Sequence, residues 1–190
     1  MTAGPSLSFR EMLQGFVGQG PDDESACADG RRRGQMFRYR ALARINDLAA
    51  FEAEPEHPVA LEGTVDYAPL GVGLPLRGGS MKLFVERPEG RRILYRLPFE
   101  APGGHFVLLG EKRLEGRRRW REMTTLHAEL YRSAGQGDAV GEAVARGILR
   151  VPVRAALMLP LTMRSPGRSP VVGLGAAVRF LRFSARSLRR

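Results

Sequence analysis

Apolar and polar residues alternate with a period of two through much of the middle of the chain, from residue 36 to residue 131. The segment 36–45 shows this most clearly: every second residue from Phe37 to Ile45 is apolar, and three of the residues between them are arginines. Alternation of this kind is typical of an antiparallel strand that buries one face. We therefore predict a half-buried strand at 36–45.

The same period recurs in the segments that follow. It predicts strands at 59–66, 81–86, 92–100 and 105–114. The Arg-Pro-Glu-Gly sequence at 87–90 suits a tight turn, because proline fixes φ and glycine accepts a positive φ. The strand at 105–114 is apolar on both faces, so we expect it at the centre of the sheet.

The stretch from Gly104 to Tyr131 holds the single tryptophan, one of the two lysines and two of the three histidines. We predict a strand at His105–Leu114, an Arg-rich turn at Glu115–Arg119 and a second strand at Trp120–Tyr131. Six or seven strands joined by short turns imply an antiparallel meander. The predicted fold class is mainly β: a meander curled into a barrel or half-barrel, lipocalin-like in outline, with one or two C-terminal helices.

The segments outside these strands are less regular. Ser8–Val17 fits either a helix or an opening strand with Glu11 exposed, and the pattern leaves both open. Gly18–Gly34 is rich in glycine and aspartate, and Ala68–Gly79 is rich in glycine and proline, so we predict loops for both. Asn46 and Asp47 precede a predicted short helix that ends near Phe51.

The period changes again in the last third of the chain. We predict a final strand at Gly147–Val151, a helix at Val153–Met163 and an amphipathic helix at Val171–Arg190. Phe180 and Phe183 lie on the side of this last helix opposite its apolar face. It could pack on the sheet, or it could contact an anionic membrane surface or a partner protein. The predicted apolar face comprises Leu174, Ala177, Val178, Leu181, Ala185 and Leu188.

A chain of 190 residues is long enough for one well-buried domain and short for two. We therefore predict a single domain at 1–190. It consists of an N-terminal segment and loop (1–34), the antiparallel sheet (36–132), and the final strand with the C-terminal helices (147–190). The segment 134–138 is predicted to be a linker.

Basic residues exceed acidic residues by 10, and 28 of the 30 basic residues are arginines. This balance favours anionic partners, although a general preference for arginine would give the same composition. The single cysteine, Cys27, cannot form an internal disulfide. The start of the chain does not resemble a secretory signal, and the apolar stretch 148–161 is interrupted by arginine and proline. We expect a cytoplasmic protein, with at most peripheral contact with a membrane.

The sequence contains no recognisable catalytic constellation. A G-x-S-x-G nucleophile elbow is absent, and His57, His105 and His127 are too widely spaced for a metal motif. The stretch 171–178 begins like a dinucleotide fingerprint, but it lacks the third glycine and the rest of the βαβ unit. We therefore predict no catalytic residues, no metal site and no cofactor, and a protein that is more consistent with a binding module than with an enzyme.

A barrel of this size is either filled by its own side chains or encloses one small apolar ligand. If it encloses a ligand, we predict that five residues line the cavity; otherwise Phe106 and Trp120 belong to a plain core. The second hypothesis is a small barrel enzyme of the isomerase or cyclase type. It requires Glu111, His127 or Asp66 to converge inside the cavity. The predicted lining residues are Phe106, Leu108, Trp120, Thr124 and Leu126.

Several stretches resemble an accessory domain found beside bacterial cholesterol oxidases of the glucose–methanol–choline oxidoreductase group. They include SFREMLQGF at 8–16, FRYRALARINDLAAF at 37–51, HPVALEGTV at 57–65 and GEKRLEGRRRWREMTTLHAEL at 110–130. The turn before the tryptophan departs from that family, because it is rich in arginine where the family tends to have acidic residues. The flavin oxidase itself is absent, so the resemblance implies no oxidase activity.

What the resemblance implies is a place in sterol or lipid metabolism. The expected function is a non-enzymatic, lipid- or sterol-associated module. The candidate partners are an apolar small molecule such as a sterol or fatty acid, an oxidoreductase, and an anionic membrane surface contacted by the C-terminal helix. Nucleic acid is disfavoured, because the aromatic residues near the arginine triplets follow the apolar phase of their strands.

Overall fold

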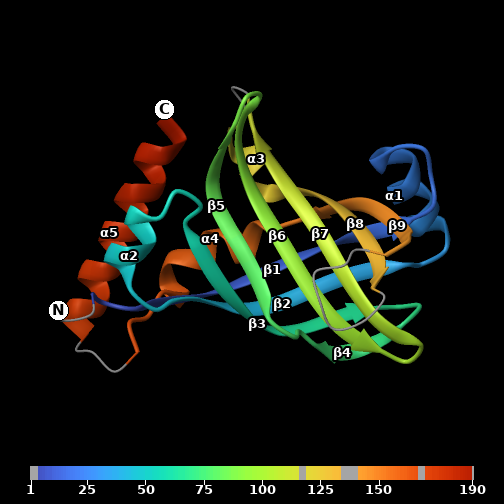
Figure 1. Ribbon diagram of the computed structural model, residues 1–190, viewed down its shortest axis with the longest axis horizontal. Helices are drawn as coiled ribbons and strands as arrows, with labels where there is room; N and C mark the ends of the chain where they lie inside the picture. Colours follow the sequence, from blue (N-terminus) through green and yellow to red (C-terminus); the bar gives the residue numbers. More distant parts are fainter. Residues whose placement is uncertain (1–3, 116–118, 134–140, 167–169, 190) are drawn as a thin grey trace.

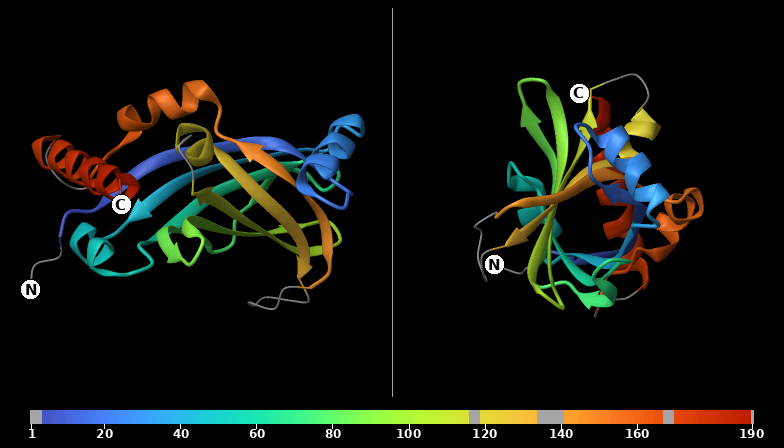
Figure 2. Two further views of the ribbon diagram at one scale, coloured as in Figure 1. Left: turned by 90° about the horizontal axis from the view of Figure 1, so that it is seen from above. Right: turned by 90° about the vertical axis from the view of Figure 1, so that its right-hand side faces the viewer.

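The computed structural model describes residues 4–115, 119–133, 141–166 and 170–189, which contain one antiparallel sheet of nine strands. Eight strands close into a barrel in which sequence neighbours pair and β9 returns to β1 (Figure 1, Figure 2). The predicted mainly-β meander is confirmed, and it is a closed barrel. The strands are β1 (Leu7–Gly18), β2 (Met36–Ile45), β3 (Pro58–Tyr67), β4 (Gly71–Pro75), β5 (Gly79–Arg87), β6 (Gly90–Ala101), β7 (Gly104–Leu114), β8 (Thr125–Ser133) and β9 (Ala143–Arg150).

The barrel closes where its first strand, β1, pairs with its last strand, β9. Two glycines make this seam unusually close. A Cβ on Gly15 would lie 2.0 Å from the carbonyl oxygen of Ile148, and a Cβ on Gly147 would lie 2.2 Å from that of Phe16. Only glycine allows two backbones to approach in this way. The short strand β4 is not part of the ring, because it pairs with the second half of β3, beyond the stretch that pairs with β5.

Helices lie at both ends of the barrel (Figure 1). One helix, α1, lies beside the end at which β1 finishes, which we call the α1 end. The helices α2 and α5 lie at the opposite end, with α3 and α4 beside that opening, and we call it the α5 end (Figure 2). The helices are α1 (Asp23–Arg32), α2 (Leu48–Ala53), α3 (Arg119–Thr124), α4 (Val153–Thr162) and α5 (Pro170–Arg189).

The prediction of a loop at 18–34 was wrong, because α1 occupies most of this segment. Asp22 caps the helix, and its carboxylate accepts a hydrogen bond of 2.8 Å from the Ser25 N–H. Gly30 lets the helix lie against β1, since a Cβ there would come within 2.4 Å of the Val17 carbonyl oxygen. The helix therefore depends on contact with the barrel, which the polar composition of the segment does not reveal.

Two further boundaries differ from the predictions. The predicted loop at 68–79 contains the short strand β4. The predicted strand at 120–131 begins with the helix α3, and β8 starts only at Thr125. Trp120 and Met123 are three residues apart, which suits a helical turn better than a strand. Residues 116–118 of the predicted arginine turn lie outside the described residues, and so does the whole predicted linker at 134–138.

The remaining elements lie where the sequence places them. The open question at 8–17 is resolved as β1, and the alternating segment at 36–45 is β2. Asp47 caps α2, because its carboxylate accepts hydrogen bonds from the N–H groups of Ala49 and Ala50. The β5–β6 hairpin and both C-terminal helices are also confirmed, and the last strand is present but begins at Ala143, before its predicted start at Gly147.

The interior of the barrel is filled unevenly along its length. Toward the α1 end, Phe37 lies 5.6 Å from Tyr67 and 6.2 Å from Phe99, measured between ring centroids. The Phe99 ring in turn stacks on Phe106 at 5.8 Å. These rings fill the interior between opposite walls of the barrel. Toward the α5 end, the interior is hollow.

Candidate ligand-binding cavity

The hollow at the α5 end is a cavity of about 230 Å³, lined by strands of the barrel and by the helices beside its opening, and it reaches the surface at the exposed Trp120 and Leu181. Phe9, Leu83 and Ile93 line it from β1, β5 and β6. Their positions follow from the alternation of the strands, because all three lie in the phase that points into the barrel. Most of the wall is therefore hydrocarbon.

A bulge in β5 contributes a further side chain to the wall. The pairing of β5 with β6 shifts register between Lys82 and Val85, and Phe84 adopts a positive φ of 53° at this point. A bulge of this kind lets two consecutive residues face the interior, and both Leu83 and Phe84 line the cavity. A bulky residue with positive φ is a strained conformation, and such strain is often found at functional sites.

Three helices form the roof of the cavity. Trp120 and Met123 reach it from α3, Leu159 from α4, and Phe180 from α5. Phe180 is buried, and its ring lies 5.6 Å from that of Phe9 on β1. Packing of side chains and a few hydrogen bonds, such as those between the backbones of Ser8 and Arg164, attach the roof to the barrel, so the roof could open without disturbing the pairing of the barrel strands.

A cluster of four polar side chains forms the floor of the cavity, where the hollow half meets the packed half. Glu11 on β1 is its centre. The Tyr39 hydroxyl donates a hydrogen bond of 2.5 Å to one carboxylate oxygen, and the Tyr95 hydroxyl donates one of 2.6 Å to the other. Both tyrosines are buried. Sequence analysis placed Glu11 on the exposed side of this strand; the structure corrects this, because Glu11 lies in the inward phase.

Lys112 on β7 completes the cluster. Its Nζ lies 3.4 Å from Glu11 Oε1 and 4.9 Å from the centroid of the Tyr95 ring. The distance to the carboxylate is long for a charge-assisted hydrogen bond, for which about 2.7–2.9 Å is usual. An ammonium group has three donors, and among the described residues Glu11 is its one hydrogen-bonding partner. Lys112 therefore retains hydrogen-bonding capacity on the cavity side.

Burial changes the protonation behaviour of the cluster. Loss of water lowers the pKa of the Lys112 ammonium below its ordinary value, although the charge of Glu11 opposes this shift. The pKa values of Tyr39 and Tyr95 are raised well above 10.0, first by burial and then by the nearby Glu11 carboxylate. Both hydroxyls therefore remain protonated and act as donors to Glu11.

This arrangement defines which ligand group the floor can accept. The tyrosine protons already point to Glu11, so Lys112 offers the available donor. A ligand carboxylate would meet the Glu11 charge at short range, whereas a hydroxyl or carbonyl oxygen would not. The floor therefore suits a neutral oxygen on an apolar molecule. Glu11 is also poorly placed to act as a general base, because three donors already engage its oxygens.

The structure separates the five predicted lining residues into two groups. Trp120 and Thr124, both on α3, line the cavity. Phe106 and Leu108 lie buried in the packed half of the barrel. Leu126 is also buried and packs over Gly110, where a Cβ would lie 2.9 Å from its side chain. None of these last three is among the residues that line the cavity.

The polar floor was missed by sequence analysis, although the sequence contains a signal for it. Lys112 lies on the same face of its strand as Phe106 and Leu108, because the three residues are separated by even numbers of positions. Its inward orientation could therefore have been predicted from the sequence. A lysine in that phase is unusual, since lysine is rarely buried without a partner. The partner could not be found in the same way, because Glu11 is 101 residues away and its segment could not be assigned to a strand or a helix.

The residues required by the enzyme hypothesis do not converge in the cavity. Glu111 pairs with Arg113 at 2.6 Å, and His127 contacts Asp23 at 2.7 Å. Asp66 on β3 forms an ion pair with Arg40 at 2.8 Å. None of Glu111, His127 and Asp66 is among the residues that line the cavity. Among the described residues, no three His, Cys, Asp or Glu side chains are grouped as metal ligands.

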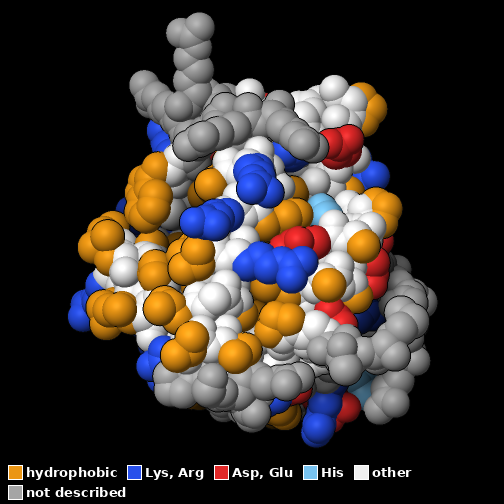
Figure 3. Space-filling view, turned by 90° about the vertical axis from the view of Figure 1, so that its left-hand side faces the viewer, with side chains coloured by type: hydrophobic (Ala, Val, Ile, Leu, Met, Phe, Trp, Pro, Cys, Tyr) orange, Lys and Arg blue, Asp and Glu red, His pale blue; other side chains and the backbone are white. Residues whose placement is uncertain are grey.

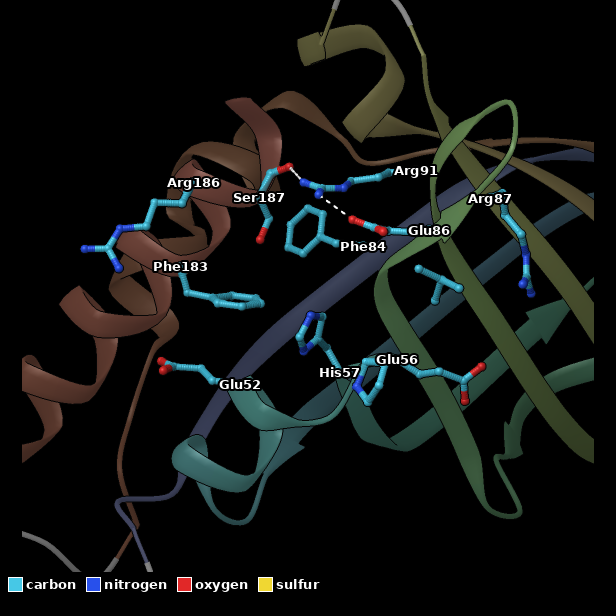
Figure 4. Close-up of a pocket in the computed structure, with 12 residues that line it drawn as sticks. Glu52, Glu56, His57, Phe84, Glu86, Arg87, Arg91, Phe183, Arg186 and Ser187 are labelled. Atoms are coloured by element: carbon cyan, nitrogen blue, oxygen red, sulfur yellow. Dashed lines mark hydrogen bonds and ion pairs between the residues drawn. The ribbon is translucent and has the colours of Figure 1, made fainter. Parts of the chain in front are cut away.

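A second hollow lies between α5, α2 and β5, and Figure 4 shows its lining residues. His57 and Phe183 contact each other edge to face in its wall, with ring centroids 4.7 Å apart. Arg91 donates to the Ser187 carbonyl oxygen and to Glu86, which ties β6 to the end of α5. Phe84 lines both this cleft and the barrel cavity, so its ring separates the two spaces.

Comparisons with protein-family models, with curated proteins and with solved structures found no match. The resemblance to the cholesterol oxidase-associated domain, and the oxidoreductase partner it implies, therefore stay predictions. None of the described helices is long and apolar enough to cross a membrane.

Proposed function

We propose that this protein is a non-enzymatic, lipid-associated binding module that holds an apolar molecule in the α5 end of its barrel. In this proposal the ligand carries a neutral oxygen, a hydroxyl or a ketone, that accepts a hydrogen bond from Lys112. The observation that carries the proposal is the combination of an apolar cavity with one incompletely satisfied ammonium group at its floor. Small-molecule sites commonly have this composition, mostly apolar with few polar groups.

The size of the cavity limits the ligand. A volume of about 230 Å³ is smaller than the roughly 300–1,000 Å³ typical of small-molecule sites. An alcohol or ketone with one medium-length chain fits without movement of the helices. A larger amphiphile such as a sterol requires α4 and α5 to move outward, because the strands of the barrel are fixed by their hydrogen bonds. Ligands with one medium-length chain are therefore expected to bind faster than sterols.

The test is a titration followed by the fluorescence of Trp120, the single tryptophan, which lines the cavity. The probes are decanol, 2-decanone, decanoic acid and cholesterol. Saturable binding of decanol and 2-decanone, with weaker binding of decanoic acid at neutral pH, would support the proposal. No saturable change with any of the four probes, or a preference for the acid, would overturn it.

The role of Lys112 needs a variant that leaves no buried charge behind. The double variant Glu11→Gln/Lys112→Met removes both charges together. It is expected to weaken binding of decanol about tenfold, the effect of losing a hydrogen bond of about 1–1.5 kcal/mol. Lys82→Met is the matched control, because Lys82 is the other lysine and pairs on the surface with Glu56. Equal binding by both variants would contradict the assigned anchor.

A further inference from the structure

The charge of this protein is divided sharply along the chain. All 20 acidic residues occur at or before Glu142, whereas ten arginines follow it. The first 142 residues are therefore neutral in sum, and residues 143–190 carry the whole excess of 10 positive charges. A general preference for arginine would not by itself remove every acidic residue from one segment.

The same segment exposes apolar side chains on α4. Val153, Leu157 and Leu161 follow one another at intervals of four residues and form a stripe along one face of the helix. Their exposed fractions lie between 63 and 68 %. No residue of α4 is buried, so the helix lies on the barrel through its small and half-buried residues. The apolar stripe faces away from the barrel.

A second exposed stripe lies on α5. Phe180 is buried against the barrel. The helix therefore packs through the side that carries Phe180, and the sequence had placed this side opposite the predicted apolar face. Val171 and Leu174 are 80 % and 68 % exposed, and Val178 is also exposed. The predicted apolar face is thus exposed only in part, because Leu181 lines the cavity and Leu188 packs against the core.

Arginines surround these two stripes. Arg154 on α4 and Arg182 and Arg186 on α5 are exposed. Within the described part of the chain, none of the three has a carboxylate within ion-pair distance. Arg179, by contrast, is held by Glu52 at 2.8 Å. Figure 3 shows hydrophobic side chains gathered over this end of the molecule, with Lys and Arg side chains between them.

We propose that α4 and α5 dock this end of the protein onto an anionic lipid bilayer. The stripes would enter the boundary between headgroups and acyl chains, and the arginines would contact lipid phosphates, as in interfacial amphipathic helices. Surfaces for nucleic acids instead combine basic residues with exposed aromatic rings on which bases stack. Here the exposed apolar residues are aliphatic, with Trp120 at 60 % exposure as the one large exposed aromatic side chain among the described residues.

Docking would bring the cavity close to the membrane. Leu159 on α4 and Leu181 on α5 line the cavity, while other residues of the same helices form the exposed stripes. A ligand leaving the bilayer would therefore meet the roof of the cavity first. Docking does not depend on ligand binding, because the exposed stripes are present whether or not the cavity holds a ligand.

The experiment is flotation of the purified protein with vesicles, followed by a spectroscopic partition measurement. One set contains phosphatidylcholine alone, and the other an equimolar mixture with phosphatidylglycerol, each at low and at physiological ionic strength. We expect strong binding to the mixed vesicles, weaker binding at higher salt, and little binding to phosphatidylcholine. Equal binding to both vesicles, or none to either, would overturn the proposal.

Two double variants separate the arginines from the apolar stripes. Arg154→Gln/Arg182→Gln is expected to weaken partition about 25-fold, which corresponds to roughly fivefold for each arginine near the surface. Arg77→Gln is the matched control, because Arg77 is exposed and lies outside the surface formed by α4 and α5. Its effect should be less than twofold. Equal losses for the control and the double variant would contradict docking through α4 and α5.

The second variant, Leu157→Glu/Leu174→Glu, is expected to weaken partition by roughly tenfold for each leucine. Its control is Val72→Glu, which changes a residue that is 79 % exposed on β4, away from α5 (Figure 1). Unchanged melting temperatures would show that the variants are folded. If the leucine variant binds vesicles as the unmodified protein does, or if a DNA duplex competes fully with the vesicles, the surface is a general polyanion site and the proposal is wrong.

Discussion

In the half of the barrel nearest α1, aromatic side chains fill the interior, whereas in the half beneath α5 a cavity and four polar side chains take their place. The same strands contribute to both halves. On β6, Phe99 packs between rings at one end, and Tyr95 turns its hydroxyl to Glu11 near the middle. On β7, Phe106 lies in the packed half and Lys112 at the floor of the cavity.

The difference shows that closing a barrel of eight strands does not decide whether it is hollow. Each half receives inward side chains at the same spacing, so the type of residue determines the space that remains. Large rings meet across the packed half and leave no room. In the hollow half, Glu11 and Lys112 attract each other at the floor, and apolar side chains that do not meet across the interior form the walls above them. The polar pair therefore marks the boundary between the two halves.

The largest effect on this boundary is expected from Glu11→Ala. The substitution leaves Lys112 as an unpaired buried charge and takes the acceptor from both tyrosine hydroxyls. Breaking a buried pair from one side typically costs about 3–5 kcal/mol of unfolding free energy. Urea denaturation followed by circular dichroism measures the loss.

The control for this prediction removes the pair as a whole. Glu11→Leu/Lys112→Met leaves no unpaired charge, and it is expected to cost clearly less than the sum of the two single substitutions. A loss below about 1 kcal/mol for Glu11→Ala would show that the floor is open to water, contrary to its buried position.

The second prediction compares one substitution in both halves. Leu97→Ala, in the packed half, is expected to destabilise the protein by about 4 kcal/mol, near the upper part of the range for buried leucines. Leu83→Ala, in the wall of the cavity, is expected to cost about 2 kcal/mol, because that side chain already borders empty space. Thermal and urea unfolding of both variants would measure this. Equal losses would contradict the division into two halves.

The third prediction concerns alkaline pH. The pKa values of Tyr39 and Tyr95 are raised in the folded protein, so the folded state binds more protons than the unfolded state once the pH exceeds about 10. Each tyrosine that stays protonated then lowers the free energy of unfolding by about 1.4 kcal/mol at pH 11. Absorbance of tyrosinate should therefore rise together with unfolding.

Lys112 contributes to the same titration with the opposite sign. Its pKa is lowered by burial, so the unfolded state binds more protons between that lowered pKa and about 10.5. Its contribution raises stability with pH in this window and is complete above it. The tyrosines therefore dominate above pH 10.5. Ionisation of all four tyrosines at their ordinary pKa, without unfolding, would contradict the buried cluster.

The packed half could be predicted from the sequence far better than the hollow half. Alternation alone identified β2 and the strands that carry Phe99 and Phe106, because those residues follow a strict period. The polar floor joins Glu11 to Lys112 across 101 residues, and no local pattern encodes that contact. The helix α3 was missed for a related reason. Trp120 and Met123 directly precede a segment that alternates with a period of two, and the strand predicted there was drawn to include them although their own spacing of three residues is helical.

The last prediction concerns the roof of the cavity, where we expect the smallest free energy of local opening. α4 has no buried residue and contains Pro160, which cannot donate a backbone hydrogen bond. Its amide hydrogens should therefore exchange with solvent through local opening of the helix. The free energy of this opening should be a small fraction of the opening free energy that protects the amides of the β6–β7 pair. Hydrogen exchange measured by mass spectrometry would compare the two regions, and adding decanol should slow exchange in α4 and α5 but leave the strands unchanged. If α4 were as well protected as β7, the roof would be rigid, and a ligand larger than the closed cavity could enter only past Phe84 from the neighbouring cleft.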